Sequence, residues 1–318
     1  MLPTRPLSKL GIALTRLGLG TLPMGPLQRR LSPAEGARVI RAAVEGGINF
    51  IDTAALYGTY EHIRQGLANW QGRVVIATKT HARQNGALAR QHIEEARRGL
   101  DRDTIDIFLC HCARTDFDAQ EWRPTLDALM EAKARNQVRM IGVSAHLAAA
   151  VRSACRHPEV EAIHPLYNIA GMGLMAGGIE EMRTAIRDAH ASRRFVYAMK
   201  ALAGGHLLAR REEALRFALA EEALDVVAVG MVTTAEVEWN LRFLQGLPLP
   251  PELWQKTAIS SKRLVVLEFV CRGCGECVKE CVNGALKIVD GKARVDDSHC
   301  LLCGYCAPRC PLFAIRVT

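Results

Sequence analysis

The 318-residue sequence predicts an α/β protein in which a (β/α)8 barrel is followed by a small, cysteine-rich α+β domain. Short β-branched runs alternate with helical stretches over most of the chain, which is typical of repeated βα units. Eight of the eleven cysteines lie in the last 48 residues. A segment with three prolines separates the two regions. We therefore expect a barrel at 1–246, a linker at 247–264 and a second domain at 265–318.

The barrel prediction rests on eight candidate strands. They lie at residues 16–20, 49–53, 74–79, 106–111, 139–144, 161–167, 194–200 and 226–230. Eight strands, each followed by a helix, in about 250 residues indicate a TIM barrel. A doubly wound sheet is the alternative, but no G-x-G-x-x-G motif follows the first strand.

The first helix has clear start and stop signals. Ser32 can cap it, Pro33 takes the first helical position and Glu35 completes a capping box. Gly46 and Gly47 follow where the helix should end.

Composition and charge exclude several classes of function. The first 20 residues interrupt their apolar positions with Pro, Lys and Arg, and the longest uncharged run, 162–179, contains four glycines, so neither an export signal nor a membrane span is expected. The net charge of +8 could attract an acidic electron-carrier protein, or it could reflect an ordinary solvated surface. No dense Lys/Arg run with interleaved aromatics is present, so nucleic-acid binding is not expected. We expect a cytoplasmic protein, whose clustered cysteines hold metal.

The clustered cysteines follow the pattern C-x2-C-x2-C-x3-C twice, with 29 positions between equivalent members. The two runs are Cys271, Cys274, Cys277, Cys281 and Cys300, Cys303, Cys306, Cys310. Between them, LKIVDGKARV predicts a hairpin around an Asp-Gly turn. A zinc ribbon needs only four thiolates, usually as two separated pairs. Three cysteines at two successive x2 steps suit three corners of an iron-sulfur cubane better.

Residues 265–318 resemble a bacterial two-cluster ferredoxin, in which the last cysteine of each run binds the other cluster. The resemblance implies two 4Fe-4S clusters. It assigns one to Cys271, Cys274, Cys277 and Cys310, and the other to Cys300, Cys303, Cys306 and Cys281. Val282 follows the first run where the pattern has Pro, whereas Pro311 follows the second.

Four polar residues stand at the carboxyl ends of the predicted strands, where TIM barrels place their chemistry. Asp52 ends the second strand with Tyr57 in the following loop, Lys79 ends the third and His111 ends the fourth. Each alone has an ordinary explanation as a cap, a packed ring or a solvated charge. Together they form a proton-transfer site, because an ammonium stabilises a phenolate, an acid holds the ammonium and an imidazole donates to a substrate oxygen.

The stretches GINFIDTAALYG, VVIATKT and DIFLCHC resemble the aldo-keto reductase family, and the resemblance spans roughly residues 10 to 245. It implies that Asp52, Tyr57, Lys79 and His111 are the catalytic tetrad of a barrel that binds a nicotinamide cofactor across its mouth and reduces aldehydes or ketones. It further implies cofactor contacts from Gly20, Thr21, Asp52, Ser144, His164, Met199, Gly230 and Asn240.

Several of these cofactor positions depart from the family pattern. Ala145 follows Ser144 where Asn is usual, His164 stands for Gln and Met199 stands for a stacking Tyr. Residues 231–238 contain no Lys or Arg to hold a 2′-phosphate and instead contain Glu236 and Glu238. We therefore expect no strong preference for NADPH over NADH.

The sequence thus predicts an oxidoreductase that interconverts a small carbonyl compound and an alcohol with NAD(P)H, and whose two 4Fe-4S clusters relay electrons. One alternative is a cluster-linked oxidoreductase that works without free nicotinamide. Another is an electron-transfer or redox-sensing iron-sulfur protein built on a barrel scaffold.

Overall fold

The computed structural model describes residues 2–113, 117, 119–255 and 263–317. Eight parallel strands close into a barrel in the order β10-β3-β4-β5-β6-β7-β8-β9. They are β3 (Leu17–Gly20), β4 (Phe50–Asp52), β5 (Val75–Thr80), β6 (Ile105–Ala113), β7 (Val138–Ala145), β8 (Ala162–Pro165), β9 (Phe195–Ala198) and β10 (Val226–Gly230). All eight predicted strands, and the (β/α)8 barrel, are confirmed.

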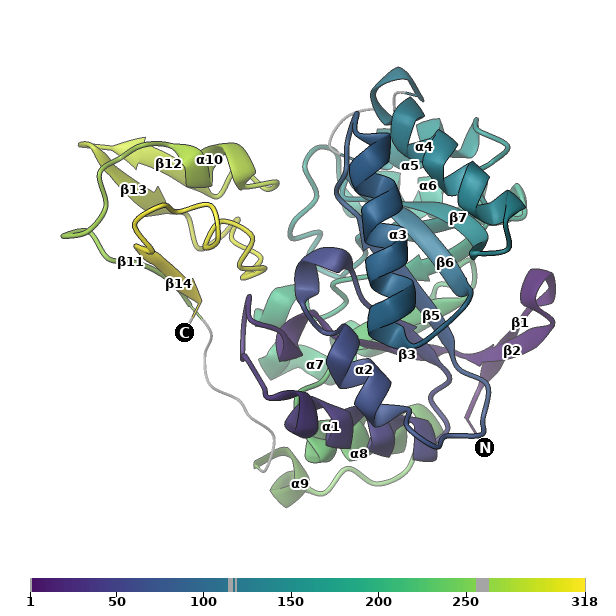
Figure 1. Ribbon diagram of the computed structural model, residues 1–318. Helices are drawn as coiled ribbons and strands as arrows, with labels where there is room; N and C mark the ends of the chain where they lie inside the picture. The colour runs from purple at the N-terminus through teal and green to yellow at the C-terminus, as the bar shows by residue number, and fades with distance from the viewer. Residues whose placement is uncertain (1, 114–116, 118, 256–262, 318) are drawn as a thin grey trace.

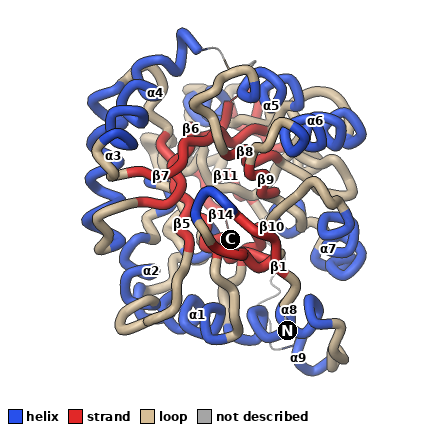
Figure 2. Tube along the Cα trace, turned by 90° about the vertical axis from the view of Figure 1, so that its right-hand side faces the viewer, coloured by secondary structure: helices blue, strands red, loops and turns tan. Residues whose placement is uncertain are grey.

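Helices surround the ring of strands (Figure 2). They are α1 (Pro33–Glu45), α2 (Tyr60–Gly66), α3 (Gly86–Leu100), α4 (Ala119–Ala134), α5 (Ala148–Cys155), α6 (Ile179–Ala191), α7 (Arg211–Ala220), α8 (Thr234–Gln245) and α9 (Pro251–Gln255). Short 3-10 helices are η1 (Ser8–Leu10), η2 (Leu22–Met24), η3 (Ala55–Tyr57), η4 (Ala203–Gly205) and η5 (Leu208–Arg210). The capping box of Ser32 and Glu35 begins α1, and Gly46 caps its end, as predicted.

An N-terminal hairpin closes one end of the barrel. Strands β1 (Thr4–Leu7) and β2 (Ile12–Thr15) pair antiparallel. Leu7, Leu10 and Leu14 of this hairpin belong to the same buried cluster as Phe50 and Tyr197 of the barrel interior. The hairpin therefore seals the barrel's amino-terminal end, so the interior is a packed core and only the opposite end is open to chemistry.

The cysteine-rich segment forms a separate small core. Its elements are β11 (Leu264–Val266), α10 (Glu276–Glu280), β12 (Leu286–Val289), β13 (Lys292–Val295) and β14 (Ile315–Val317). Strand β11 pairs with β14, and β12 pairs with β13. The predicted hairpin turn is confirmed, because Asp290 and Gly291 have φ of 50° and 68°, the left-handed values that a two-residue hairpin turn requires.

The predicted linker 247–264 contains α9 and the first residue of β11, and its residues 256–262 lie outside the described part of the chain. The domain boundaries remain a prediction. The cysteine-rich segment lies beside the barrel, away from the β1–β2 hairpin (Figure 1). In the ranges that the structure describes, no helix is both long and apolar enough to cross a membrane.

Candidate active site

The four predicted catalytic residues meet at the open end of the barrel. Asp52 ends β4, Tyr57 ends η3, and Lys79 and His111 lie near the carboxyl ends of β5 and β6. All four side chains are buried. Parallel strands bring residues that are 59 positions apart in the sequence to one rim, since neighbouring strands end side by side.

Lys79 is the centre of this group. Its Nζ donates to Asp52 Oδ2 at 2.7 Å and to the Thr53 carbonyl at 2.7 Å, and it lies 3.4 Å from the Tyr57 hydroxyl. Burial raises the pKa of Asp52, and the Lys79 charge opposes that rise. Burial likewise lowers the pKa of Lys79, and Asp52 opposes that fall. The two charges therefore compensate each other's loss of water and place a cation against the Tyr57 oxygen.

Two aromatic groups below the rim hold the Asp52 carboxylate in place. Tyr197 donates to Asp52 Oδ1 at 3.1 Å. Its ring stacks on His164 with centroids 3.9 Å apart, and His164 Nδ1 donates to the Tyr197 carbonyl at 2.7 Å. Burial and the Asp52 charge raise the pKa of Tyr197 well above its usual value, so this phenol stays neutral and acts as a donor.

His111 is a buried imidazole at the same rim. Burial is the main cause that lowers its pKa well below 6.5, and the Lys79 charge adds to the effect. Its Nε2 lies 3.3 Å from the hydroxyl of Tyr305, a residue of the second cysteine run. The Tyr305 hydroxyl also donates to the Tyr57 hydroxyl at 3.3 Å. The cysteine-rich domain therefore reaches the predicted catalytic residues directly.

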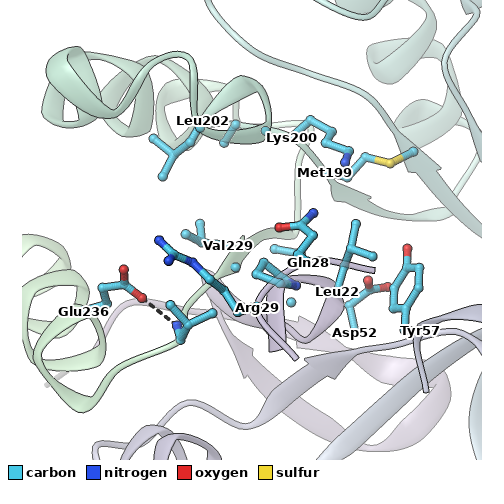
Figure 3. A pocket seen from close by; sticks show the side chains of 18 of the residues that line it. Leu22, Gln28, Arg29, Asp52, Tyr57, Met199, Lys200, Leu202, Val229 and Glu236 are labelled. Atoms are coloured by element: carbon cyan, nitrogen blue, oxygen red, sulfur yellow. Dashed lines mark hydrogen bonds between the residues drawn. The ribbon is translucent and has the colours of Figure 1, made fainter. Parts of the chain in front are cut away.

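A cleft of about 960 Å³, part of it open to solvent, runs outward from Asp52 and Tyr57. Figure 3 shows Met199, Lys200 and Leu202 along one wall, opposite Gln28 and Arg29. Among the predicted cofactor-binding residues, those that line the cleft are Gly20, Asp52, His164, Met199 and Gly230.

The other three predicted cofactor residues are placed differently. Thr21 is buried, and its hydroxyl donates to the Asp52 carbonyl. Asn240 is buried on α8, where its side chain donates to the Glu236 carbonyl. Ser144 is buried on β7 beside His164 of β8. None of the three is among the residues that line the cleft. Their role as cofactor ligands remains a prediction.

The far end of the cleft is closed by the start of α8. The Glu236 carboxylate accepts from the backbone N–H groups of Val232 at 2.5 Å and Thr233 at 3.3 Å, completing a capping box. Arg29 extends into the cleft near this end (Figure 3). Arg242, by contrast, pairs with Glu238 at 2.9 Å on an outer turn of the helix.

The eight C-terminal cysteines surround two cavities. One is lined by Cys271, Cys274, Cys277 and Cys310, and the other by Cys281, Cys300, Cys303 and Cys306. These are the two sets that the ferredoxin resemblance implies. Backbone N–H groups donate to three of the sulfurs, at Ala285 to Cys281, Ala293 to Cys271 and Ala314 to Cys310.

Such N–H···S bonds stabilise thiolates, and those to Cys271 lower its pKa. The eight cysteines line the walls of the two cavities, four in each, which is the arrangement that two cubane clusters need.

Sequence reasoning missed Tyr305, Lys200 and Arg29. Lys200 directly follows Met199 beyond the end of β9, so the rule that chemistry lies at strand ends could have found it. Tyr305 and Arg29 had no such signal. Tyr305 lies between two cysteines of a repeated pattern, and Arg29 lies in a loop with another arginine beside it.

Comparison with known families gives two matches. Residues 16–213 match the model of the aldo/keto reductase family, and residues 263–311 match that of the 4Fe-4S dicluster domain. The first match covers more than half of the chain, and the second covers all eight clustered cysteines.

Individual relatives are distant. The chain is 27% identical to L-galactose dehydrogenase of Arabidopsis thaliana over 44% of its own length, and the alignment spans about half (47%) of that protein. It is 27% identical to D-threo-aldose 1-dehydrogenase of a Pseudomonas species, over 82% of this chain and 78% of that one. Among solved structures, an aldo/keto reductase from Klebsiella pneumoniae in complex with NADP and acetate superposes with a TM-score of 0.60 at 22% identity, covering 78% of this chain and 92% of that one. This likeness shows the barrel fold.

Proposed function

Because the chain belongs to the aldo/keto reductase family and carries a 4Fe-4S dicluster domain, we propose that it interconverts a small carbonyl compound and its alcohol. Asp52, Tyr57, Lys79 and His111 carry the proton chemistry. A nicotinamide in the cleft would supply or accept the hydride, and the two clusters would carry electrons one at a time between that nicotinamide and an outside electron carrier. The observation that carries this proposal is the Lys79 Nζ held at once by Asp52 and against Tyr57. The proposal includes a cytoplasmic setting, where cysteines stay reduced.

The residues of the cleft fit a nicotinamide dinucleotide. Leu22 and Met199 provide apolar contacts near Tyr57, where a flat ring would pack, and Met is well suited to packing on a ring. Farther out, Lys200 and Arg29 bring positive charge to the two walls, which suits a diphosphate. A nicotinamide bound there would supply or accept a hydride at the substrate carbon.

Each catalytic residue has a distinct task in this proposal. Tyr57 donates its proton to the carbonyl oxygen, and Lys79, 3.4 Å away, stabilises the phenolate left behind. Asp52 holds Lys79 in place, and Tyr197 holds Asp52. Neutral His111 donates a hydrogen bond to the same carbonyl oxygen, because its lowered pKa keeps it from carrying a charge that would compete with Lys79.

The two cysteine cavities fit cubane clusters, which would each supply one-electron transfer. The cavity of Cys281, Cys300, Cys303 and Cys306 also has Tyr305 in its wall, so it lies next to the catalytic rim. The other cavity includes Cys274, which is exposed, so it is the one from which electrons would reach an outside partner.

The surface beside this second cavity suits a protein partner. Phe269 and Phe313 are 86% and 75% exposed, and both lie at the same end of the β11–β14 pair. Arg272 and Arg316 stand exposed in the same segments. Exposed aromatic side chains with basic neighbours favour binding of an acidic electron-carrier protein.

A second candidate function is a cluster-linked oxidoreductase that works without free nicotinamide. It is favoured by the contact between Tyr305 and the catalytic hydroxyl. It is also favoured by His164, which stands at the expected Gln position but donates to the Tyr197 carbonyl.

An anaerobic titration of iron-replete protein with NADH and with NADPH separates these candidates. If the first is correct, nicotinamide binds, and adding an aldehyde consumes it. If the second is correct, an alcohol substrate changes the cluster absorbance while nicotinamide does not bind. Protein that binds nicotinamide and turns over no carbonyl compound from a broad panel would contradict the carbonyl chemistry.

A further inference from the structure

Hydrogen bonds hold the second cysteine run against the mouth of the barrel. We name residues 300–305 the mouth loop. Gln28 Nε2 donates to the Leu302 carbonyl at 3.1 Å, and His206 Nε2 donates to the Cys300 carbonyl at 2.7 Å. The barrel thus recognises the backbone of the mouth loop from two different sides.

Two glycines allow the mouth loop to lie unusually close to the barrel. A Cβ on Gly204 of the barrel would lie 2.1 Å from the Leu301 carbonyl oxygen. A Cβ on Gly304 of the mouth loop would lie 2.3 Å from the Leu27 carbonyl oxygen. Neither position accepts a side chain without separating the two surfaces. The close contact between the mouth loop and the barrel therefore depends on glycine at both positions.

This interface places the Tyr305 hydroxyl beside two of the predicted catalytic residues. That oxygen lies 3.3 Å from the Tyr57 hydroxyl and 3.3 Å from His111 Nε2. The Tyr305 ring packs against an apolar group that includes Leu22 and Leu27. The contacts of the ring and of the loop backbone hold the hydroxyl there.

A substrate oxygen that receives a proton from Tyr57 and a hydrogen bond from His111 must occupy the same point. Hydrogen-bonded oxygen atoms stay at least about 2.5 Å apart, and proton transfer needs a heavy-atom distance of roughly 2.6–3.2 Å. His111 Nε2 carries at most one hydrogen, and a near-linear hydrogen bond directs it to one acceptor, which is the Tyr305 oxygen in this structure. A substrate oxygen that accepts this hydrogen must displace the Tyr305 hydroxyl. The substrate and the Tyr305 hydroxyl therefore compete for one position.

We propose that Tyr305, contributed by the cluster domain, occludes the candidate active site: its hydroxyl occupies the carbonyl-oxygen position, and only a ligand that displaces it reaches Tyr57 and His111. This inference rests on the proposed function. It implies that the free site is largely closed, and that the apparent affinity for an oxygen ligand is reduced by the fraction of molecules in which Tyr305 is in place.

The test measures ligand binding as well as turnover. Anaerobic, cluster-loaded protein is titrated with benzoate by calorimetry, for the wild type, Tyr305→Phe and Tyr305→Ala. If Tyr305 occupies the position in at least nine of ten molecules, its removal tightens benzoate binding about tenfold or more. Tyr305→Phe keeps the ring and its packing, so it serves even if the alanine variant folds poorly. Iron content and visible absorbance verify that the clusters are retained.

Two further variants locate the effect. Val289→Ala, on the exposed β12 strand, is the matched control and should bind benzoate as the wild type does. Adding Tyr57→Phe to Tyr305→Phe should remove the gain in affinity. In turnover of benzaldehyde, Tyr305→Phe should lower KM without lowering kcat.

Unchanged or weaker benzoate binding in both Tyr305 variants would overturn the inference. A fall in kcat for Tyr305→Phe with KM unchanged would also overturn it, since that result makes Tyr305 a participant in the chemistry. The proposed function has a separate test, because its failure appears as full turnover by Tyr57→Phe whatever happens at Tyr305.

Discussion

Lys79 shows how much of the site is decided by a single buried side chain. Its ammonium has three oxygen neighbours, from Asp52, Thr53 and Tyr57, and its exposed fraction is 1%. The sequence alone predicted this association, because Asp52, Tyr57 and Lys79 all follow strand ends. It could not predict Tyr197, whose donation to Asp52 depends on a side chain that points into the barrel.

Tyr57→Phe is the cleanest test of the proton donor. The variant keeps the ring that packs beside Lys79 and removes only the hydroxyl, so carbonyl reduction should fall about 10² to 10⁴-fold while the fold is unchanged. Single-turnover kinetics would measure the chemical step, and circular dichroism would check the fold. Full activity in this variant would contradict the assigned tetrad.

Lys79→Met should also abolish activity, but this substitution lowers the stability of the protein as well. It leaves the Asp52 carboxylate buried without its cation, which typically costs about 3–5 kcal/mol of stability. The double variant Lys79→Met with Asp52→Asn should recover much of that stability and none of the activity. Thermal unfolding compared across the three proteins measures this recovery.

The buried histidines predict how stability depends on pH. Burial lowers the pKa of His111 and of His164 well below 6.5. In the unfolded chain both imidazoles take up protons below pH 6.5, whereas in the folded chain they do not. The stability that these two histidines contribute is therefore fully present above pH 6.5 and is lost as the pH drops below it, by up to about 1.4 kcal/mol per pH unit for each histidine.

The matched variant His164→Gln should show a shallower loss of stability over the same range, because one titrating group is gone. Melting temperatures between pH 5 and 8, followed by tryptophan fluorescence in both proteins, measure the difference. Equal slopes would show that His164 is protonated in the folded protein.

At the scale of elements, caps and turns were predictable and supporting elements were not. The α1 capping box and the Asp290-Gly291 turn were both read correctly, because each depends on residues next to one another in sequence. The β1–β2 hairpin was not predicted. Its leucines are recognisable only once the barrel interior that they cover is known.

Helix α8 carries the prediction about cofactor preference. Glu236 caps this helix at the end of the cleft, where its negative charge disfavours a 2′-phosphate, while Arg29 brings a positive charge to the same region. We expect NADPH to bind less than about tenfold tighter than NADH, a difference of ~1.4 kcal/mol.

Glu236→Gln should keep a side-chain oxygen for the cap and shift binding toward NADPH, whereas Arg29→Gln should shift it toward NADH. Fluorescence titrations at fixed ionic strength give both ratios. A wild-type preference for NADPH above tenfold that survives Arg29→Gln would place the phosphate at some other cation.

At the scale of the whole molecule, the sequence predicted both domains and gave no sign of how they meet. The spacing of the cysteines indicated two cubane sites, and the ferredoxin resemblance supplied the exchange of Cys281 and Cys310 between them. The interface depends on backbone carbonyls of Leu27, Leu301 and Leu302 and on the absence of side chains at Gly204 and Gly304. Such features leave no pattern in composition or periodicity.

The crossed arrangement of cysteines makes Cys310→Ser informative. The wild-type protein purified without oxygen should contain close to eight iron and eight sulfide per chain. Cys310→Ser should damage the cluster of Cys271, Cys274 and Cys277, although Cys310 belongs to the other run. Electron paramagnetic resonance of the reduced protein would follow each cluster separately, with Cys155→Ser as a control outside both cavities. Stoichiometric zinc without sulfide would contradict the assignment.

The cysteines of the two cavities differ in solvent exposure, and this difference affects how fast each cluster is lost to dioxygen. Cys300 and Cys306, in and next to the mouth loop, are buried, whereas Cys274 of the other cavity is exposed. Dioxygen destroys iron-sulfur clusters that it can reach, and solvent access controls that reach. Brief aeration should therefore remove the outer cluster first and leave close to four iron per chain. Replacing Gly204 with valine, which forces the mouth loop off the barrel, should abolish this order of loss.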